Sequence, residues 1–287
     1  MLINLEVYVY CIMGKMSSIK NVRTSKVTAI SYPLSIISSP ASIRGAYSVK
    51  LISSSYTGAT LNIRRSSDNT TADFYSDNLG NLGTTYKGTG TTLTAWLGAD
   101  IAFVTMWNDQ SGLGINATQT TQAQQPTYDT INKCVSFNGT TTFLNVATAY
   151  LPTANSSHTV IMKHFQFLAG TLVYFNNGTT HNGFRKSDNG NKYLNWWYAN
   201  DFTTTGGVIS NNNIATFKYD NTATPNSTFY LNSVLDSTMA RGPATQVGGG
   251  QQFIGKSIYG EFLNGQLYYL YIANNAMTDN NRLILEI

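Results

Sequence analysis

The side chains able to carry out acid–base or nucleophilic chemistry are few in this chain of 287 residues. The glutamates and histidines are Glu6, Glu261, Glu286, His158, His164 and His181. The histidines show no spacing typical of metal ligands, and the only cysteines are Cys11 and Cys134. Two cysteines exclude a disulfide framework and a metal site built on several thiolates. We therefore expect no metal, no cofactor and synthesis in a reducing compartment.

A short loop motif, Asp109-Gln110-Ser111-Gly112, is a distinctive cluster of polar residues. One interpretation makes Asp109 a catalytic or sugar-binding acid. The other is structural, because an aspartate close to a glycine commonly accepts backbone N–H groups within its own turn. We favour the structural interpretation for all four residues.

The densest aromatic cluster lies at residues 193–198, with the sequence YLNWWY. On a strand, side chains alternate between two faces, so Tyr193, Asn195 and Trp197 share one face and the intervening residues share the other. A flat aromatic ring beside an amide matches the C–H face and the hydroxyls of a sugar ring. We therefore name Tyr193, Asn195 and Trp197 as candidate ligand-binding residues, with burial of both faces as the alternative.

The elements that must position these residues are β-strands. Alternating or continuous apolar stretches predict strands at residues 60–64, 101–107, 159–162, 215–220, 228–232 and 262–272, with the fourth and fifth forming a hairpin. Asn-Gly pairs between strands supply the positive φ angles that tight turns require. Capping residues predict short helices at residues 91–98 and from Thr278 or Asp279 toward Glu286. The whole pattern indicates a sandwich or a barrel.

The charge and hydropathy of the chain argue against nucleic acid as a partner and against a membrane span. Charged residues make up 11% of the chain and the net charge is +4, without the clustered basic stripe of a nucleic-acid binder. Residues 1–13 form an apolar run that is too short to span a bilayer and lacks the features of a signal peptide. We expect no nucleic-acid partner and no membrane span. Whether this leader is an upstream-start artefact, a strand or a docking arm stays open.

Residues 46–146 resemble the catalytic domain of the α-L-arabinofuranosidase B family, glycoside hydrolase family 54. The most specific stretch, residues 106–119, is MWNDQSGLGINATQ, which is similar to the family signature YDQSGNGxxxTQ, with Asn108 where the family often has tyrosine. Residues 46–58, 63–69 and 135–139 match in the same order. The resemblance implies an all-β, concanavalin- or laminin-G-like jelly-roll β-sandwich at residues 45–287. Residues 1–44 would then form a short N-terminal extension.

The family's catalytic residues have no direct counterparts here. In that family the nucleophile is a glutamate in a Met-Glu-Asn context, and the general acid is an aspartate in a Gly-Gly-Asp-Asn loop. The stretch that corresponds to the nucleophile, residues 196–202, contains no glutamate, and its nearest acid is Asp201. The stretch that corresponds to the general acid, residues 254–258, contains no aspartate, and its nearest acid is Glu261. The family's adjacent cysteines are replaced by residues 174–178, YFNNG. Asp201 and Glu261 are therefore the candidate replacement pair for catalysis.

Three functions remain open. We favour a non-enzymatic glycan-binding or structural module on a virion or an extracellular surface, because the acids are missing and the polar surface is weakly charged. Its partners would be glycans or other subunits of a particle, and a homo-oligomer is a further expectation. The alternatives are an arabinofuranosidase-like glycoside hydrolase acting on arabinose-containing polysaccharide, and a scaffold protein in which residues 1–44 dock to a partner.

Overall fold

The computed structural model describes residues 32–83, 91–146, 156–166, 170–176, 181–186, 192–197, 200–206, 213–242 and 252–286. The chain divides into two units, Met1–Ser31 and Tyr32–Ile287, and all the described residues belong to the second. The apolar leader at residues 1–13, with Glu6 and Cys11, lies outside the described residues. The boundary predicted at residue 44 falls inside the second unit, at the start of its first strand.

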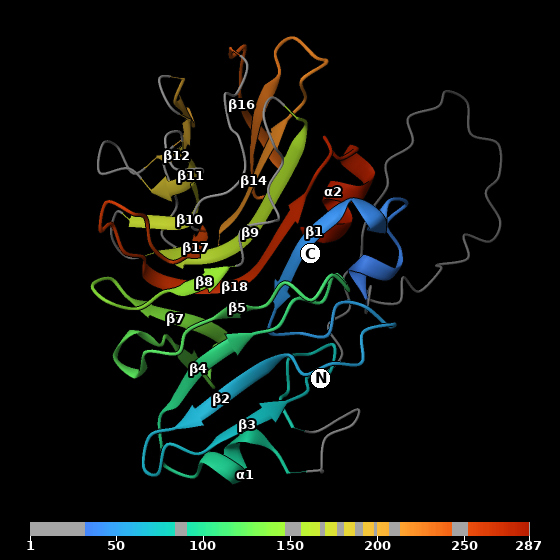
Figure 1. Ribbon diagram of the computed structural model, residues 1–287. Helices are drawn as coiled ribbons and strands as arrows, with labels where there is room; N and C mark the ends of the chain where they lie inside the picture. Colours follow the sequence, from blue (N-terminus) through green and yellow to red (C-terminus); the bar gives the residue numbers. More distant parts are fainter. Residues whose placement is uncertain are drawn as a thin grey trace, which may run out of the picture. The chain divides into compact units, whose positions relative to one another are not determined.

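The described strands form an all-β sandwich, as predicted, and every ladder between them is antiparallel (Figure 1). One layer runs in the order β16 (Val234–Met239), β15 (Ser227–Leu231), β14 (Asn213–Tyr219), β9 (His158–Gln166) and β18 (Asn264–Ala273). The far edge of β18 pairs with two strands, β1 (Ile43–Ser48) along one half and β7 (Cys134–Asn138) along the other. The layer ends at β6 (Thr127–Asp129), which pairs with β7.

The second layer contains ten strands within the described part of the chain. Its order is β13 (Phe202–Thr203), β12 (Tyr193–Trp197), β11 (His181–Lys186), β10 (Gly170–Asn176), β17 (Gln252–Ile254), β8 (Leu144–Val146), β5 (Ala117–Thr118), β4 (Ala102–Trp107), β2 (Leu61–Arg65) and β3 (Thr71–Phe74). In Figure 1 the labels of this layer descend from β12 to β3. One residue pair, Phe103 opposite Thr127, also joins β4 to β6 and links the two layers.

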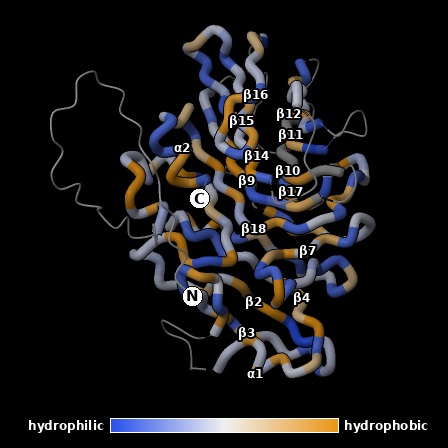
Figure 2. The backbone as a smooth tube through the Cα atoms, turned by 180° about the vertical axis from the view of Figure 1, so that it is seen from behind, coloured by the Kyte–Doolittle hydropathy of each residue, from blue (hydrophilic) through white to orange (hydrophobic). Residues whose placement is uncertain are grey.

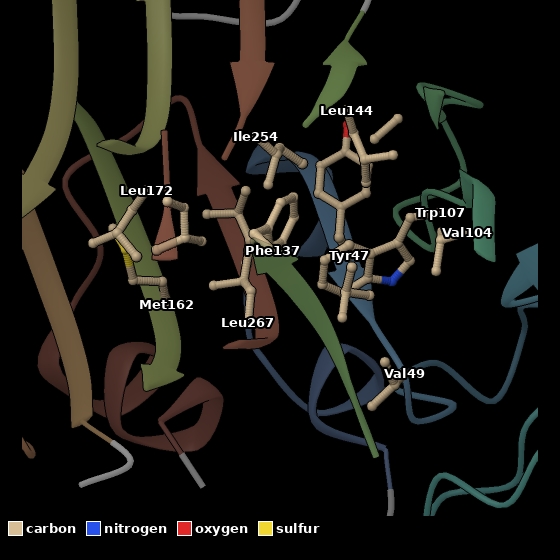
Figure 3. Close-up of a cluster of buried hydrophobic side chains, with 14 of the residues drawn as sticks. Tyr47, Val49, Val104, Trp107, Phe137, Leu144, Met162, Leu172, Ile254 and Leu267 are labelled. Atoms are coloured by element: carbon tan, nitrogen blue, oxygen red, sulfur yellow. The ribbon is translucent and has the colours of Figure 1, made fainter. Parts of the chain in front are cut away.

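The main core lies between the two layers. The side chains that fill it come from alternate positions of strands in both layers, as the period of two in a strand requires. Figure 3 shows Met162 and Leu172 at one end of this cluster, Tyr47 and Trp107 at the other, and Phe137 between them. Hydrophobic stretches follow the central strands, and many turns between them are hydrophilic (Figure 2).

A second apolar cluster lies on the outer side of β9, β18 and β1, beneath the helix α2 (Asp279–Leu285). Leu285 packs there with Leu34, which lies in the 3-10 helix η1 (Pro33–Ser35), and with Ile37, which follows that helix. The Ser38 backbone N–H donates to Asn281 Oδ1 at 3.1 Å and fastens this segment to α2. Further 3-10 turns are η2 (Pro40–Ser42) and η3 (Gln122–Gln124).

Both predicted helices are present. Helix α1 (Leu93–Leu97) begins after Thr92, whose hydroxyl accepts from the Ala95 N–H, and ends at Gly98. Helix α2 begins after Thr278, whose hydroxyl accepts from the Asn281 N–H. Side-chain oxygens at these positions satisfy N–H groups that have no partner within the helix. The predicted hairpin of β14 with β15 is also confirmed, with Ala215 opposite Leu231.

Candidate functional site

Strand β12 turns Tyr193 and Asn195 toward the space between the layers. The Tyr193 hydroxyl shares a hydrogen bond of 2.6 Å with Nε2 of His164 on β9, and Asn195 Oδ1 accepts from the Arg241 guanidinium at 2.5 Å. Their exposed fractions are 2% and 0%. The face of β12 that the sequence assigned to a ligand is thus enclosed by the second layer. The side chain of Trp197 lies outside the described part of the structure.

The enclosed face of β12 also contacts a buried arginine. Burial lowers the pKa of Arg241, while the negative charge of Asp201 acts in the opposite direction. The guanidinium also lies over the rings of Phe202 and Phe217, about 6 Å from each centroid. Arg241 and Asn195 therefore join the two layers through hydrogen bonds and ring contacts, which is a structural role.

Trp196 lies on the opposite face of β12. Phe184 of β11 packs across the sandwich on Phe217, so its neighbour Arg185 also points to the outer face. Trp196 packs on the edge-to-face pair formed by Phe143 and Phe253, whose centroids are 5.6 Å apart. This outer face therefore carries its own aromatic cluster, separate from the main core.

Arg185 and Glu261 form an ion pair on this outer face. The guanidinium lies 2.7 Å from Glu261 Oε1, and the two side chains are 20% and 27% exposed. The same guanidinium lies 5.9 Å from the centroid of the Trp196 ring. A partly exposed pair beside an indole offers both donor and acceptor atoms next to a flat apolar surface.

The turn between β17 and β18 completes the site. Lys256 and Phe262 pair across its base, and the buried Ser257 hydroxyl accepts from the backbone N–H groups of Tyr259 and Glu261 at 3.1 and 3.4 Å. These bonds order the turn and hold the Tyr259 ring 5.1 Å from that of Trp196. We call the resulting surface the Trp196 face; it consists of Arg185, Trp196, Phe253, Lys256, Tyr259 and Glu261.

The two candidate acids interact with different arginines. Strands β12 and β13 pair with Leu194 opposite Thr203 and Asn195 opposite Phe202. Asp201 is exposed and directly precedes β13, and its negative charge acts on the enclosed Arg241. Glu261 lies on the β11 side, where it pairs with Arg185. Among the described contacts, Glu261 thus belongs to the Trp196 face, whereas Asp201 acts on the enclosed Arg241.

The Asp109 motif lies elsewhere and holds backbone together. Asp109 is 2% exposed, and its carboxylate accepts from the N–H groups of Ala46, Ser111 and Ile115 at 2.8 to 3.2 Å and from the Ser111 hydroxyl at 2.6 Å. The Gln110 side chain, also 2% exposed, bonds to backbone groups of residues 48, 50 and 52. Gly112 completes the turn with a φ of +89°. Asp109 and Gln110 thus tie this loop to β1 and the segment after it.

Two cavities lie away from the Trp196 face. One, of about 490 Å³, is lined by Gln110, Ser111 and Gly112 and by the hydroxyl-rich residues 53–58. The other, of about 540 Å³, lies beside Arg64, Phe103 and Gln125. Arg64 Nε donates to Gln125 Oε1 at 2.7 Å, so the most polar group at the second cavity already has a partner.

Membrane and metal sites were sought in the same residues. None of the described helices is both long and apolar enough to cross a membrane. Within the described ranges, no three histidine, cysteine, aspartate or glutamate side chains are close enough together to hold a metal ion.

Comparison with known proteins gives a structural likeness only. No family model and no curated protein matches the chain. A GH54 α-L-arabinofuranosidase soaked with a cyclic sulfate inhibitor matches with a TM-score of 0.66 and 16% identity, over 89% of this chain and 64% of that chain. An arabinofuranosidase complexed with arabinofuranosyl-α-1,2-xylobiose matches with a TM-score of 0.67 at the same identity and coverage.

Identity of 16% is evidence for fold alone, and this chain spans slightly less than two thirds of those chains' length. The likeness extends well beyond the residues that carried the sequence resemblance, since it covers 89% of the chain. In fold, the chain resembles the catalytic domain of the GH54 α-L-arabinofuranosidases.

Proposed function

We propose that this domain binds glycans on the Trp196 face. A sugar ring combines a face of C–H groups with an edge of hydroxyls, so its binding site needs a flat apolar surface beside hydrogen-bonding groups. The Trp196 and Tyr259 rings, 5.1 Å apart, offer the apolar surface, and the Arg185–Glu261 pair beside them offers donors and acceptors. This juxtaposition is the observation that carries the proposal. The oligosaccharide bound by a structure of similar fold makes arabinofuranosyl-xylobiose the first ligand to test.

The test is calorimetric titration of the full chain with arabinofuranosyl-xylobiose and with longer arabinoxylan and arabinan fragments. We expect Trp196→Ala to weaken binding at least about tenfold, since an aromatic anchor at the centre of a site commonly contributes more than 1 kcal/mol. Trp96→Ala is the matched control. Trp96 is also half-buried, packs on Phe74 and lies beneath Arg65, but belongs to α1. Equal affinities of the two variants would refute the proposal.

Glycoside hydrolysis is the second candidate, favoured by the partly exposed Glu261 carboxylate on the Trp196 face and by the likeness in fold to arabinofuranosidases. Hydrolysis with retention needs two carboxyl groups about 5–5.5 Å apart, and hydrolysis with inversion needs about 6.5–9.5 Å. The experiment is turnover of p-nitrophenyl α-L-arabinofuranoside by wild type, Asp201→Asn and Glu261→Gln. Turnover that either substitution abolishes would assign the enzyme activity. A folded wild-type protein that binds glycan without turnover would leave binding as the function.

A site of action on a virion or an extracellular surface, together with other subunits, belongs to the same proposal. It is supported by the low share of charged residues and by the absence of the family's catalytic acids from the aligned positions. Light scattering of the purified chain would measure a homo-oligomer, and labelled antibody on intact particles or cells would measure surface display. Labelling only after particles or cells are broken would contradict this placement.

A further inference from the structure

Lys256 is a cation held over aromatic rings at the edge of the Trp196 face. Its Nζ lies 3.7 Å from the ring centroid of Phe143, 4.5 Å from that of Phe253 and 6.0 Å from that of Phe262. Ring faces attract a cation through their quadrupoles, so these three rings fix the position of the ammonium. In the part of the chain that the structure describes, no carboxylate or carbonyl oxygen pairs with this ammonium.

The other charges of the face are balanced. Arg185 is paired with Glu261 at 2.7 Å, so these two residues contribute no net charge. Lys256 therefore gives the Trp196 face an excess of one positive charge. A lysine ammonium is a compact, strongly hydrated charge with three donors, and it binds an anionic oxygen without demanding one planar geometry.

The cation and the stacking surface share one support. Trp196 packs on the Phe143–Phe253 pair, and the same two rings lie beneath the Lys256 ammonium. The rings thus fix an apolar surface and an unpaired cation side by side. A ligand that used both would carry a flat C–H face and an anionic group on one ring.

We propose that the Trp196 face selects acidic saccharides, with Lys256 binding the carboxylate or sulfate group of the sugar. This inference rests on the proposed glycan binding and adds the chemical class of the ligand. A charge-assisted hydrogen bond is about twice as strong as a neutral one, so a single such contact gives a preference of roughly tenfold over a neutral sugar of the same size.

The experiment is calorimetric titration of the full chain with three probes of matched length: neutral arabino-oligosaccharide, oligogalacturonate and a sulfated oligosaccharide. We expect at least one acidic probe to bind about tenfold more tightly than the neutral one, and its affinity to fall as salt is raised. Comparison of the oligogalacturonate with the sulfated probe distinguishes the two sources of negative charge.

Three variants assign the preference to the residue. Lys256→Met keeps an unbranched apolar stem against the rings and removes the charge, so we expect it to bind acidic and neutral probes equally. Lys256→Arg should retain the preference. Lys50→Gln removes one charge from an exposed lysine after β1 and should change nothing.

The outcomes separate the two proposals. Equal binding of acidic and neutral probes by wild type overturns the acidic preference and leaves glycan binding intact. A preference that survives in Lys256→Met overturns the role of Lys256. Failure of every probe to bind overturns glycan binding itself, and the inference with it.

Discussion

At the scale of single residues, the interior of the sandwich contains two histidines whose burial favours the neutral form of the imidazole. His158 and His164 are 3% and 0% exposed, and burial lowers their pKa values to about 4 and about 3. Unfolded histidine has a pKa near 6.5. Between these values the unfolded chain binds protons that the folded chain does not, so stability must depend on pH.

We therefore expect the histidines to leave the free energy of unfolding at its full value above about pH 7. This free energy should fall as the pH drops from about 6.5 toward 4. Each histidine should account for about 2 kcal/mol lost between pH 7 and pH 5. Urea titrations at intervals of half a pH unit measure the slope. His164→Gln should reduce the slope by about half, whatever it does to stability at pH 7. A slope unchanged by that substitution would contradict the assignment.

The sequence predicted single residues where the chemistry is local. Asp109 bonds within its own turn, and the pairing of an aspartate with nearby glycine and serine already indicates such a turn. The sequence did not predict the Arg185–Glu261 ion pair, because these two residues are far apart in sequence and the order of the strands brings them together. The alternation in β12 defines two faces, but only the position of β9 and β14 decides which one is buried.

At the scale of elements, helix α2 is held by a buried charge pair. The Arg282 guanidinium lies 2.7 Å from Glu286 Oε2, with the two side chains 4% and 1% exposed, and 3.8 Å from the Tyr230 ring centroid. A second partner of the arginine, Asp279, is 63% exposed. Arg282 thus has one buried carboxylate partner, Glu286, and one exposed partner, Asp279.

Glu286→Ala should destabilise the fold by about 3 kcal/mol or more, because it leaves a buried guanidinium without its main counter-charge. Asp279→Ala is the matched control and should cost less than about 1 kcal/mol, as exposed pairs contribute little. Chemical denaturation of both variants makes the comparison. Equal losses would show that burial does not set the strength of this pair.

The turn that carries Lys256 and Glu261 depends on two glycines that differ in their surroundings. Gly255 has a φ of +89°, and a Cβ there would lie 2.5 Å from the Phe137 ring, whereas Gly260 has a φ of +77° and open space around it. Strain of this backbone conformation costs a side chain about 1–2 kcal/mol. Only Gly255 adds a steric clash to that strain.

Gly260→Ala should therefore lower stability by about 1 kcal/mol, and Gly255→Ala by clearly more, since Phe137 belongs to the main core and has little room to move. Thermal unfolding of the two variants gives the difference. If Gly255→Ala unfolds no earlier than Gly260→Ala, close packing against Phe137 does not require the glycine.

Element prediction succeeded where apolar pattern and turn chemistry agreed. Strands such as β4 and β14 and both helix caps follow from their own residues. Strand β16 was not predicted, because Val234 and Leu235 are exposed and the strand exists through its pairing with β15. That pairing is a tertiary property that a short sequence window does not contain.

At the scale of the whole molecule, the compact unit begins at Tyr32, well before the first strand. Leu34 and Ile37 are 6% and 5% exposed and pack with Leu285. The resemblance predicted the sandwich from residue 45 onward, since the matching stretches begin at residue 46. It could not show that an apolar segment before them covers the outer side of β9 and β18.

A chain that begins at Tyr32 is the reference for the contribution of residues 32–44. A chain that begins at Gly45 should be less stable than this reference by about 4 kcal/mol or more, because it lacks Leu34, Ile37 and Ile43 of the second cluster, which contribute about 1.5–3 kcal/mol each. Calorimetry of the two truncated chains tests the contrast. Similar unfolding temperatures would mean that residues 32–44 add nothing to the sandwich.

Strand β18 pairs with β9 on one edge and with β1 and β7 on the other, and it is one of the last elements of the chain. On the ribosome, the first strand of the domain therefore emerges long before its neighbour exists. Until Asn264 and the residues after it have left the exit tunnel, β1, β7 and β9 present open edges able to pair with other nascent chains. Closure of the sandwich therefore follows the synthesis of β18, and its three partner strands must wait for it.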